Sequence, residues 1–336
     1  MNNEGIKGHA VPVKILSRML IGDTLPHSLL FTGISGIGKR LVARRVLNTL
    51  FCESVDINKP CLVCPPCRKF AAGGIPDFIV ISPDEKGRIP IGNPDKPEEN
   101  SVRHLISRLS KRSITGRFGV IIDGIDKISI EGQNALLKTL EEPQDGTGII
   151  MISSNRSSIL PTIISRSLEI HFNPLDSEDI LNILKDHEPV TGFEAALSGG
   201  SVETTLMLAR NDNIEIITGL AQQISDAASE NMTLNPDLKN AAEKTGHDNL
   251  ISVLVNFFRL ALLNSIGAAS FQIPEKITGD PEKQKAIIKI LLASGKGLSN
   301  NMNISMLLKG LVYNHTMTPS SGFISLPDFF RDSQRR

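Results

Sequence analysis

The stretch GISGIGKR, residues 33–40, decides how the rest of the sequence is interpreted. It follows the apolar run HSLLFTG and precedes the amphipathic run KRLVARRVLNTLF. A strand, a glycine-rich turn and a helix in that order form a loop whose backbone N–H groups and helix N-terminus cradle phosphate. Gly33, Gly38 and Lys39 stand where this pattern requires them, so the sequence predicts a phosphate-loop (P-loop) fold.

Short apolar runs alternate with helical patterns on both sides of this loop, which is typical of a parallel sheet covered by helices. The predicted strands are residues 27–33, 77–82, 117–123, 148–154 and 167–172, and the predicted helices include 39–51, 101–112, 128–142 and 176–187. Residues 83–100 are rich in proline, glycine and charge and predict an exposed loop. Beyond the last strand only helical patterns continue, to about residue 318.

These patterns predict an α/β P-loop domain with a parallel sheet, followed by two all-α domains. A chain of 336 residues is long for one hydrophobic core, in keeping with several domains. The predicted boundaries are 1–174 for the α/β domain, 175–210 for a small helical domain and 211–336 for a second helical domain.

Bulk charge and hydropathy exclude some classes of function. Lysine plus arginine and aspartate plus glutamate number 36 each, so a bulk field that coats nucleic acid is not expected. The N-terminus has no apolar secretion signal. The apolar run from Asn249 is interrupted by Asn256, Arg259 and Asn264, as in a buried amphipathic helix rather than a membrane span. A cytoplasmic location without a membrane partner is predicted.

Arg40 stands where the phosphate-loop pattern has serine or threonine. That hydroxyl is a ligand of Mg²⁺, which needs hard oxygen ligands in near-octahedral geometry. A guanidinium has only donors and a fixed positive charge, so Arg40 cannot ligate the ion and repels it. The residues speak against Mg·ATP binding and leave open whether any nucleotide binds without metal.

The run VIIDGID, residues 120–126, matches the second motif of such pockets, an apolar strand that ends in an acid, here Asp123. Hydrolysing proteins carry a glutamate next, which orients the attacking water, whereas this chain has Gly124. Positioning and charge neutralisation supply nearly all of phosphoryl-transfer catalysis. The two losses therefore predict little or no intrinsic ATPase activity, unless another residue supplies a substitute ligand.

All four cysteines lie between residues 52 and 67, with the spacing C-x8-C-x2-C-x2-C. Short C-x2-C turns bring thiolates to one tetrahedral zinc ion, about 2.3 Å from each sulfur. Four protein ligands leave no open position for water, so the sequence predicts a structural zinc site made by Cys52, Cys61, Cys64 and Cys67. The alternatives are four reduced thiols, or a nucleic-acid reader, for which the intervening residues lack basic and aromatic side chains.

The segment SSNRSSILPTIISRS, residues 153–167, carries two further polar features. Ser153 to Asn155 end a strand and are expected at the phosphate side of the sheet. Arg166 precedes the last strand, and taken alone such an arginine is usually a solvated charge or part of an ion pair.

Together, GISGIGKR, the cysteine spacing, VIIDGIDKIS, NALLKTLEEP (134–143) and ILPTIISRS (159–167) resemble the clamp-loader branch of the AAA+ proteins. The resemblance covers roughly residues 5–210 by motif. It implies an AAA+ domain, a helical lid at 175–210 and a helical collar for oligomerisation at 211–336. It also implies a hetero-pentameric ring with ATPase subunits and a delta subunit, within the replicative DNA polymerase complex, that contacts the sliding clamp and primer-template DNA.

The resemblance gives Arg166 a role. Family members carry an arginine in a Ser-Arg-Cys motif that reaches the nucleotide of the next subunit, and Arg166 matches it, with Ser167 in place of the cysteine. Such arginine fingers are worth about 10³ to 10⁵ in rate. The family's sensor arginine after a Gly-Ser pair is replaced here by Glu203, whose carboxylate would repel a phosphate.

The leading interpretation is a non-hydrolysing clamp-loader subunit that supplies Arg166 in trans. The second is an active AAA+ ATPase, either the loader's motor subunit or a helicase loader, against which Arg40, Gly124 and Glu203 speak. The third is a zinc-dependent DNA-binding module. Zero net charge and the lack of a basic, aromatic stripe speak against that one.

Overall fold

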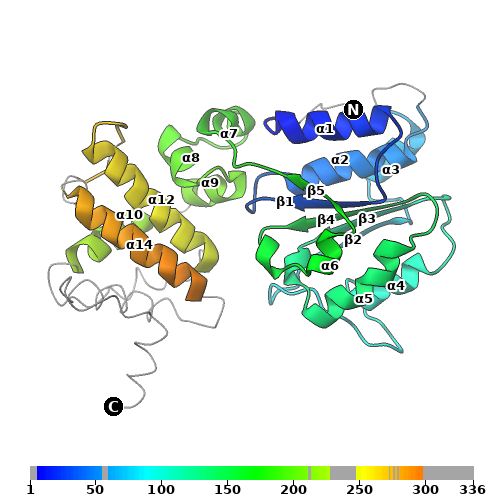
Figure 1. The fold of residues 1–336 in the computed structure, drawn as a ribbon. Coiled ribbons are helices and arrows are strands. Elements are labelled where there is room, and N and C mark those ends of the chain that lie inside the picture. The colour runs from blue at the N-terminus through cyan, green and yellow to red at the C-terminus, as the bar shows by residue number, and fades with distance from the viewer. Residues whose placement is uncertain are drawn as a thin grey trace, which may run out of the picture. The chain divides into compact units, whose positions relative to one another are not determined.

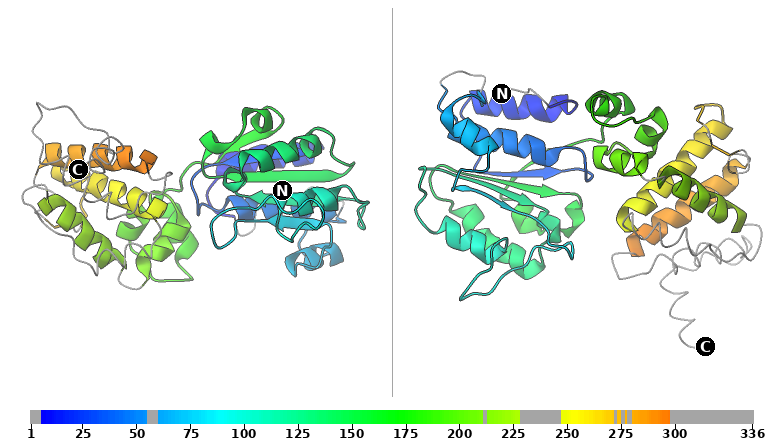
Figure 2. Two further views of the ribbon diagram at one scale, coloured as in Figure 1. Left: turned by 90° about the horizontal axis from the view of Figure 1, so that it is seen from below. Right: turned by 180° about the vertical axis from the view of Figure 1, so that it is seen from behind.

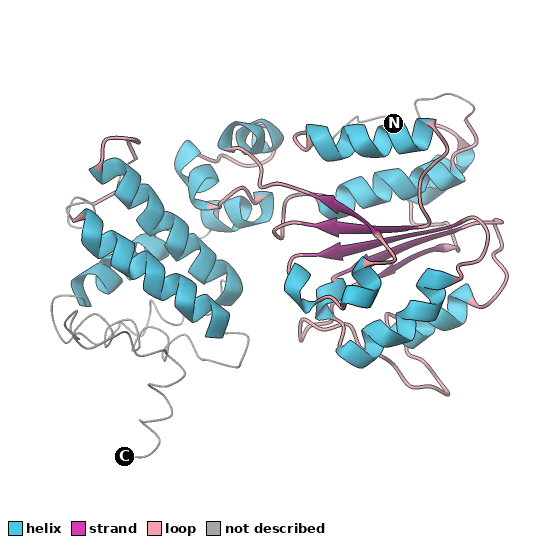
Figure 3. Cartoon of the chain, viewed as in Figure 1, coloured by secondary structure: helices cyan, strands magenta, loops and turns pink. Residues whose placement is uncertain are grey.

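The computed structural model describes residues 6–54, 60–210, 213–227, 247–271, 273–274, 277 and 280–297. The chain divides into two compact units, Met1–Leu175 and Asp176–Arg336 (Figure 1). Among the described residues, the strands all lie in the first unit and the second unit contains only helices (Figure 3). The predicted fold class, an α/β P-loop domain followed by all-α structure, is confirmed.

One parallel sheet of five strands, in the order β2-β3-β4-β1-β5, forms the centre of the first unit. The strands are β1 (Ser28–Thr32), β2 (Phe78–Ile81), β3 (Phe118–Asp123), β4 (Thr147–Ser153) and β5 (Leu168–His171). Side chains of β1 and β4 are buried along their whole length, which explains why these strands are continuous apolar runs rather than alternating ones. All five predicted strands are present.

Helices cover both faces of this sheet, with α1 and α2 on one face and α4, α5 and α6 on the other (Figures 1 and 2). The helices of this unit are α1 (Ala10–Ile21), α2 (Lys39–Phe51), α3 (Pro65–Ala71), α4 (Val102–Leu109), α5 (Ile130–Glu141) and α6 (Pro161–Ile164), with short 3₁₀ turns η1 (Ile125–Lys127) and η2 (Arg156–Ser158). Of these helices, α2, α4 and α5 were predicted from the sequence, whereas α1, α3 and α6 were not.

Serine side chains cap the N-termini of two predicted helices, α4 and α5. Ser101 accepts a hydrogen bond from the backbone N–H of His104 at 3.2 Å and begins α4. Ser129 does the same for Gly132 at 3.3 Å and begins α5. Serine is a favoured N-cap because its oxygen pairs with an N–H that the helix leaves open.

The segment 83–100 contains no helix or strand, as predicted, but it is not fully exposed. Ile89 is buried and forms a parallel bridge with Ile128. Its backbone N–H donates to the carbonyl of Lys127 at 3.1 Å. The prediction of an exposed loop rested on composition and missed this single apolar anchor.

The second unit contains α7 (Ser177–Leu184), α8 (Gly192–Leu197), α9 (Val202–Ala209), α10 (Asn213–Ala227), α12 (His247–Ser265) and α14 (Pro281–Gly297). One apolar core joins α8 and α9 with α10, α12 and α14. The division of this unit into a lid and a collar stays a prediction. The stretches 228–246 and 298–336 of the predicted collar lie outside the described residues.

The apolar run that begins at Asn249 is α12, with Leu250, Phe257 and Phe258 buried in the core of this unit. This confirms the prediction of a buried amphipathic helix. Over the described part of the chain, no helix is both long and apolar enough to cross a membrane.

Candidate functional site

The glycine loop connects β1 to α2 with the backbone geometry that a phosphate cradle requires. Gly33, Gly36 and Gly38 all have positive φ, at 142°, 74° and 94°. At Gly33 a side chain is also excluded by space, because a Cβ would lie 2.3 Å from the carbonyl oxygen of Phe172. The glycines that the sequence analysis picked out are therefore required by the backbone.

Lys39, the first residue of α2, is buried against this loop. Its Nζ donates to the carbonyl oxygens of Gly33 at 2.7 Å and Ile34 at 2.5 Å. The ammonium thus lies inside the loop, beside the place where the phosphate-loop pattern puts a phosphate.

Arg40 follows Lys39 and extends to the end of β3, where its Nη1 donates to Oδ2 of Asp123 at 3.1 Å. The strand register places Asp123 opposite Ile152 of β4 and Thr32 opposite the next residue, Ser153, so both lie at the carboxyl edge of the sheet. The structure therefore brings Lys39, Arg40 and Asp123 together. A fixed positive charge occupies the carboxylate that a metal would need.

Gly124 adds a constraint that the sequence did not reveal. Its φ is 112°, a region that side chains rarely adopt, and a Cβ there would lie 3.2 Å from Cγ of Lys127 and 3.3 Å from Cγ of Pro83. In the sequence this position stands out only as a missing carboxylate. The backbone itself disfavours any side chain, including a glutamate.

The polar residues at the end of β4 also lie at the carboxyl edge of the sheet, and their hydrogen bonds go to nearby residues of the loops. Ser153 Oγ accepts from the N–H of Asn155 at 3.0 Å, and Asn155 Oδ1 accepts from Ser157 at 3.1 Å. Ser154 donates to both carboxylate oxygens of Asp126 at 3.3 Å. These bonds fix the loop after β4 to the turn after β3.

Glu203 lies in the second unit, in the first turn of α9. The helix begins at Ser201, whose side chain accepts from the N–H of Thr204 at 3.2 Å. A carboxylate in a first helical turn interacts favourably with the helix dipole, which accounts for a glutamate here without any ligand. Its relation to a sensor arginine stays a prediction.

Arg166 lies at the opposite edge of the sheet from the glycine loop. The strand that follows it begins with Leu168, which pairs with Leu29 near the start of β1, and Ser167 Oγ lies 3.1 Å from Ser28 Oγ. Parallel strands have all their starts at one edge, so about 13 Å of strand separates this turn from Gly33. Arg166 and the glycine loop of the same chain are thus not brought together.

The guanidinium of Arg166 is held by the end of α5. Its Nε donates to Oε1 of Glu141 at 2.6 Å, and its Nη2 lies 2.5 Å from the same oxygen. Its Nη1 donates to the carbonyl of Thr162 at 3.1 Å and to Ser165 Oγ at 3.4 Å. Both charged side chains are partly exposed, 36% for Arg166 and 46% for Glu141. The sequence analysis did not predict the role of Glu141 in this pair.

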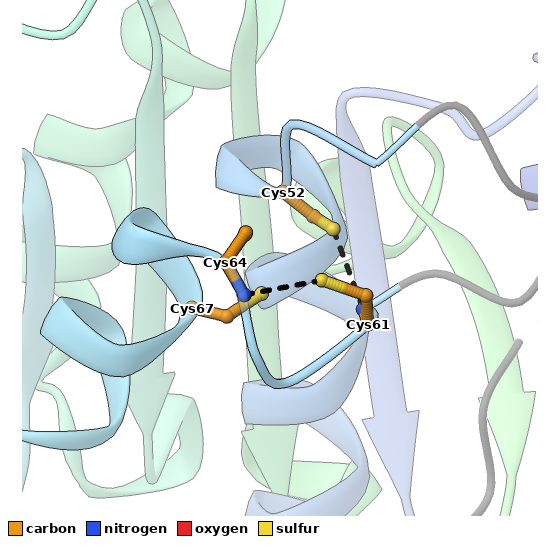
Figure 4. Close-up of side chains that lie close together, drawn as sticks. All are labelled: Cys52, Cys61, Cys64 and Cys67. Atoms are coloured by element: carbon orange, nitrogen blue, oxygen red, sulfur yellow. Dashed lines mark hydrogen bonds between the residues drawn. The ribbon is translucent and has the colours of Figure 1, made fainter.

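The four cysteines converge at the end of α2, with ligand atoms all within 4.8 Å of one another (Figure 4). Cys52 follows α2, Cys61 and Cys64 lie in the loop, and Cys67 is on α3. None forms a disulfide. Four thiolates around zinc lie about 3.8 Å apart, so a slight contraction of this cluster fits the ion.

Backbone N–H groups point at the sulfurs, as expected where thiolates must be stabilised. The N–H of Cys61 donates to Sγ of Cys52, and that of Cys64 donates to Sγ of Cys61, each at 3.4 Å (Figure 4). Hydrogen bonds from the backbone of Val63 and Cys64 lower the pKa of Cys61 to about 6. Burial, with a further contribution from the Cys64 side chain, raises the pKa of Cys67 to about 12. The cluster can hold a metal ion.

An aromatic cluster attaches the cysteine segment to the rest of the unit. The rings of Phe70 on α3 and Phe78 on β2 lie 4.3 Å apart, and Phe51 lies 5.9 Å from Phe70. The guanidinium of Arg44 lies 5.4 and 5.3 Å from the Phe70 and Phe78 ring centres. Sequence reasoning missed this anchor, because its members are far apart in the chain.

The fold and the loop together define a class of protein. A parallel sheet of this order, with a glycine loop after β1, an acid at the end of β3 and an all-α unit later in the chain, is that of a P-loop protein of the AAA+ class. The family model described as DNA polymerase III, delta subunit, matches residues 8–176. The chain belongs to this family, as a delta-prime type of clamp-loader subunit.

Bacterial relatives agree with this membership. DNA polymerase III subunit delta' of Pseudomonas aeruginosa is 33% identical over 216 residues, 59% of this chain and 63% of that protein. Subunit delta' of Bacillus subtilis is 30% identical over 60% of this chain and 59% of that protein. Subunit tau of Escherichia coli is 31% identical over 54% of this chain and 28% of that protein. The chain thus spans 28% to 63% of the lengths of these relatives.

Proposed function

We propose that this chain is a non-hydrolysing subunit of a replicative clamp-loader assembly. It joins ATPase subunits and a delta subunit in a hetero-pentameric ring and helps to load the sliding clamp onto primed DNA. It supplies Arg166 to the nucleotide site of a neighbour. Relatives named as tau and delta' subunits of DNA polymerase III support a place in such an assembly.

The observation that carries the proposal is the ion pair between Arg40 and Asp123, at 3.1 Å. Mg²⁺ in a P-loop pocket depends on the loop hydroxyl and on this carboxylate. Here the hydroxyl is absent and the carboxylate is already paired with a cation that cannot be removed by pH. Hydrolysis without the metal loses the charge neutralisation on which phosphoryl transfer depends.

The position of Arg166 supports action in trans. It lies at the amino edge of the sheet, whereas its own glycine loop lies at the carboxyl edge. The side chain is partly exposed and so accessible to another molecule. A guanidinium that reaches a neighbour's γ-phosphate stabilises the transition-state charge, which gives a chain without ATPase activity a part in turnover.

The cysteine cluster is proposed as a structural zinc site. Four thiolates are the donor set that suits zinc, and they leave no position for water or substrate. The cluster lies at the C-terminal end of α2, and the contact between Phe70 and Phe78 attaches the cysteine segment to β2. Zinc there would stabilise the amino edge of the sheet, the same edge that carries Arg166.

The test is the ATPase activity of the reconstituted assembly with Arg166→Ala in this chain. The neighbour's site should lose about 10³-fold or more in rate, since fingers are worth about 10³ to 10⁵. Turnover is best measured in an assembly whose other ATPase subunits are inactivated. Assembly itself, followed by size-exclusion chromatography, should be unchanged.

Arg112→Ala is the matched control, because Arg112 is an exposed arginine in the loop that precedes β3, at the same edge. It should leave the rate within about twofold, as expected for a surface charge. Full activity with Arg166→Ala, or ATPase activity of the lone chain well above that of its Lys39→Ala variant, would contradict the proposal.

A further inference from the structure

All three nitrogens of the Arg166 guanidinium have a partner inside its own chain: Nε and Nη1 donate hydrogen bonds, and Nη2 lies in an ion pair. Nε and Nη2 form one edge of the planar fork, and both face Oε1 of Glu141 at 2.6 and 2.5 Å. Nη1 faces the carbonyl of Thr162 at 3.1 Å. A phosphate is held best by two parallel N–H groups of one edge. The edge that carries Nε is therefore already occupied by a carboxylate.

Glu141 stands at an unusual place for an acid. It is the last residue of α5, where the helix dipole is negative and a carboxylate is disfavoured. The next residue, Glu142, is exposed, and among the described residues it forms no ion pair. A cation beside this helix end relieves both charges, which explains why Arg166 is drawn to it.

The backbone around Glu141 is fixed. The carbonyl of Leu140 accepts from Nε2 of His27 at 3.0 Å, and Leu140 is buried. Gln133 of α5 donates to the carbonyl of Ser158 at 2.9 Å and accepts from the N–H of Leu160 at 2.9 Å, which ties α5 to the segment that leads to Arg166. Separation of the pair must therefore come from side-chain rotation and not from movement of the helix.

We propose that Glu141 is a positioning residue that holds Arg166 in the free subunit and competes with the neighbour's phosphate for it. This inference rests on the proposed function of Arg166. When a nucleotide enters the neighbouring site, its phosphate takes over the Nε and Nη2 edge and the Glu141 carboxylate is released to solvent. Glu141 thus sets the nucleotide concentration at which the finger engages.

The relative strengths fix the expected effect. A partly exposed ion pair changes an equilibrium by only about 1.5- to 5-fold. A finger contact changes the rate by about 10³- to 10⁵-fold. The nucleotide phosphate can accept both N–H groups of the Nε and Nη2 edge in parallel, whereas Glu141 offers one oxygen to them, so Glu141 tunes engagement and does not block it. Loss of the Glu141 charge should therefore change the half-saturating ATP concentration and leave the maximal rate the same.

The experiment uses the reconstituted assembly in which only the neighbouring site is active, with Glu141→Gln in this chain. Glutamine keeps the shape and one acceptor oxygen but removes the charge. The half-saturating ATP concentration should fall by about 2- to 5-fold, with the maximal rate within about twofold of the unmodified assembly. The difference should shrink at 1 M salt, where charges are screened beyond about 3 Å.

Glu142→Gln is the matched control, since it removes the adjacent charge at the same helix end without touching the pair. Glu141→Asp keeps the charge but shortens the side chain, so the half-saturating concentration should fall between those of the unmodified chain and Glu141→Gln. Circular dichroism of each isolated chain checks that the fold is kept.

The Arg166→Ala variant distinguishes the proposed finger function of Arg166 from the proposed competition by Glu141. If Arg166→Ala leaves the rate unchanged, the finger function and this inference both fail. If Arg166→Ala lowers the rate but Glu141→Gln leaves the half-saturating concentration unchanged, raises it, or lowers the maximal rate, the finger stands and the competition is wrong. A lower half-saturating concentration for Glu141→Gln but not for Glu142→Gln supports the inference.

Discussion

The carboxyl and amino edges of the same sheet differ in which residues of the clamp-loader motifs they carry. At the carboxyl edge the glycine loop and Lys39 are intact, but Arg40 neutralises Asp123 and the next residue is a glycine. At the amino edge Arg166 is held in a defined, accessible position. The same strands carry both edges, yet they end in different loops. The residues at one edge of a sheet can therefore change while the scaffold and the other edge stay the same.

The glycine loop also has a role in packing, whether or not it takes part in catalysis. Gly33 packs directly on the carbonyl of Phe172, and Ile37 within the loop is buried in the core of α1, α2 and the sheet. A larger residue at Gly33 would clash with backbone, which cannot move cheaply. The loop is thus part of the packing of this unit. Its presence alone says little about catalysis.

Metal removal should produce the largest effect and would damage only the amino edge. Structural zinc contributes about 10 to 16 kcal/mol in small metal-folded peptides. The rest of this unit has its own core, so only part of that energy should be lost from the domain. We expect the chain to bind one zinc per molecule and to lose more than about 3 kcal/mol of unfolding free energy in chelator.

Metal content by mass spectrometry and denaturant unfolding measure this result. Restoring zinc after chelation should return the unfolding midpoint, which controls for damage by the chelator. Cys61→Ser with Cys64→Ser should behave as the chelated chain does. A chain that unfolds at the same midpoint with and without zinc would show that the cysteine segment does not support this edge.

Much of the carboxyl edge was predictable from the sequence. Glycines, Lys39 and the acid at the end of an apolar run lie within short, characteristic motifs, so their meeting follows from strand–loop–helix order. The strands β1 to β4 were found because their apolar runs are nearly continuous, whereas β5 has a mixed sequence, LEIH. Helix α3 was missed because it is short and begins with two prolines, Pro65 and Pro66, in a segment interpreted for its thiols.

Other features depend on contacts between distant residues and left no local signal. The Arg166–Glu141 pair joins positions 25 residues apart, and the contact of Arg44 with Phe70 and Phe78 joins three separate elements. The positive φ of Gly124 was also invisible, because a glycine in sequence does not state the conformation it adopts. Such features can be recognised only from the three-dimensional structure.

A side chain at Gly124 should have the next largest effect. Gly124→Glu restores the group that orients water in hydrolysing relatives of the motif. The backbone conformation at this position is strained for any side chain, and such strain costs about 1 to 3 kcal/mol. We expect Gly124→Glu to lower the unfolding free energy by that amount and to give no ATPase activity, because Arg40 still occupies Asp123.

Gly87→Ala controls for the loss of a glycine. Gly87 also has positive φ, at 70°, but a Cβ there meets nothing within 4 Å. It should cost less than Gly124→Ala, since only the latter adds contacts with Lys127 and Pro83. Unfolding in denaturant distinguishes the two. Brisk ATP hydrolysis by Gly124→Glu would break the contrast between the two edges.

The smallest effect is expected at Ser167, where the clamp-loader motif has cysteine. Ser167 Oγ donates to the carbonyl of Ile163 at 2.9 Å and lies 3.1 Å from Ser28 Oγ, which ties the turn to the start of β1. A thiol is a weaker donor, so Ser167→Cys should cost less than about 1 kcal/mol of unfolding free energy.

The proposed finger should not be affected by this change, because the side-chain hydrogen bonds of Arg166 go to Glu141, Thr162 and Ser165 and not to residue 167. ATPase activity of the assembly with Ser167→Cys should stay within about twofold of the unmodified rate, a change within the range of one exposed charge contact. Ser28→Ala removes the other end of the bond and should behave alike. A tenfold or greater loss of ATPase rate with Ser167→Cys alone would mean that the serine itself positions the guanidinium. The function of the amino edge would then require serine at the position where the clamp-loader motif has cysteine.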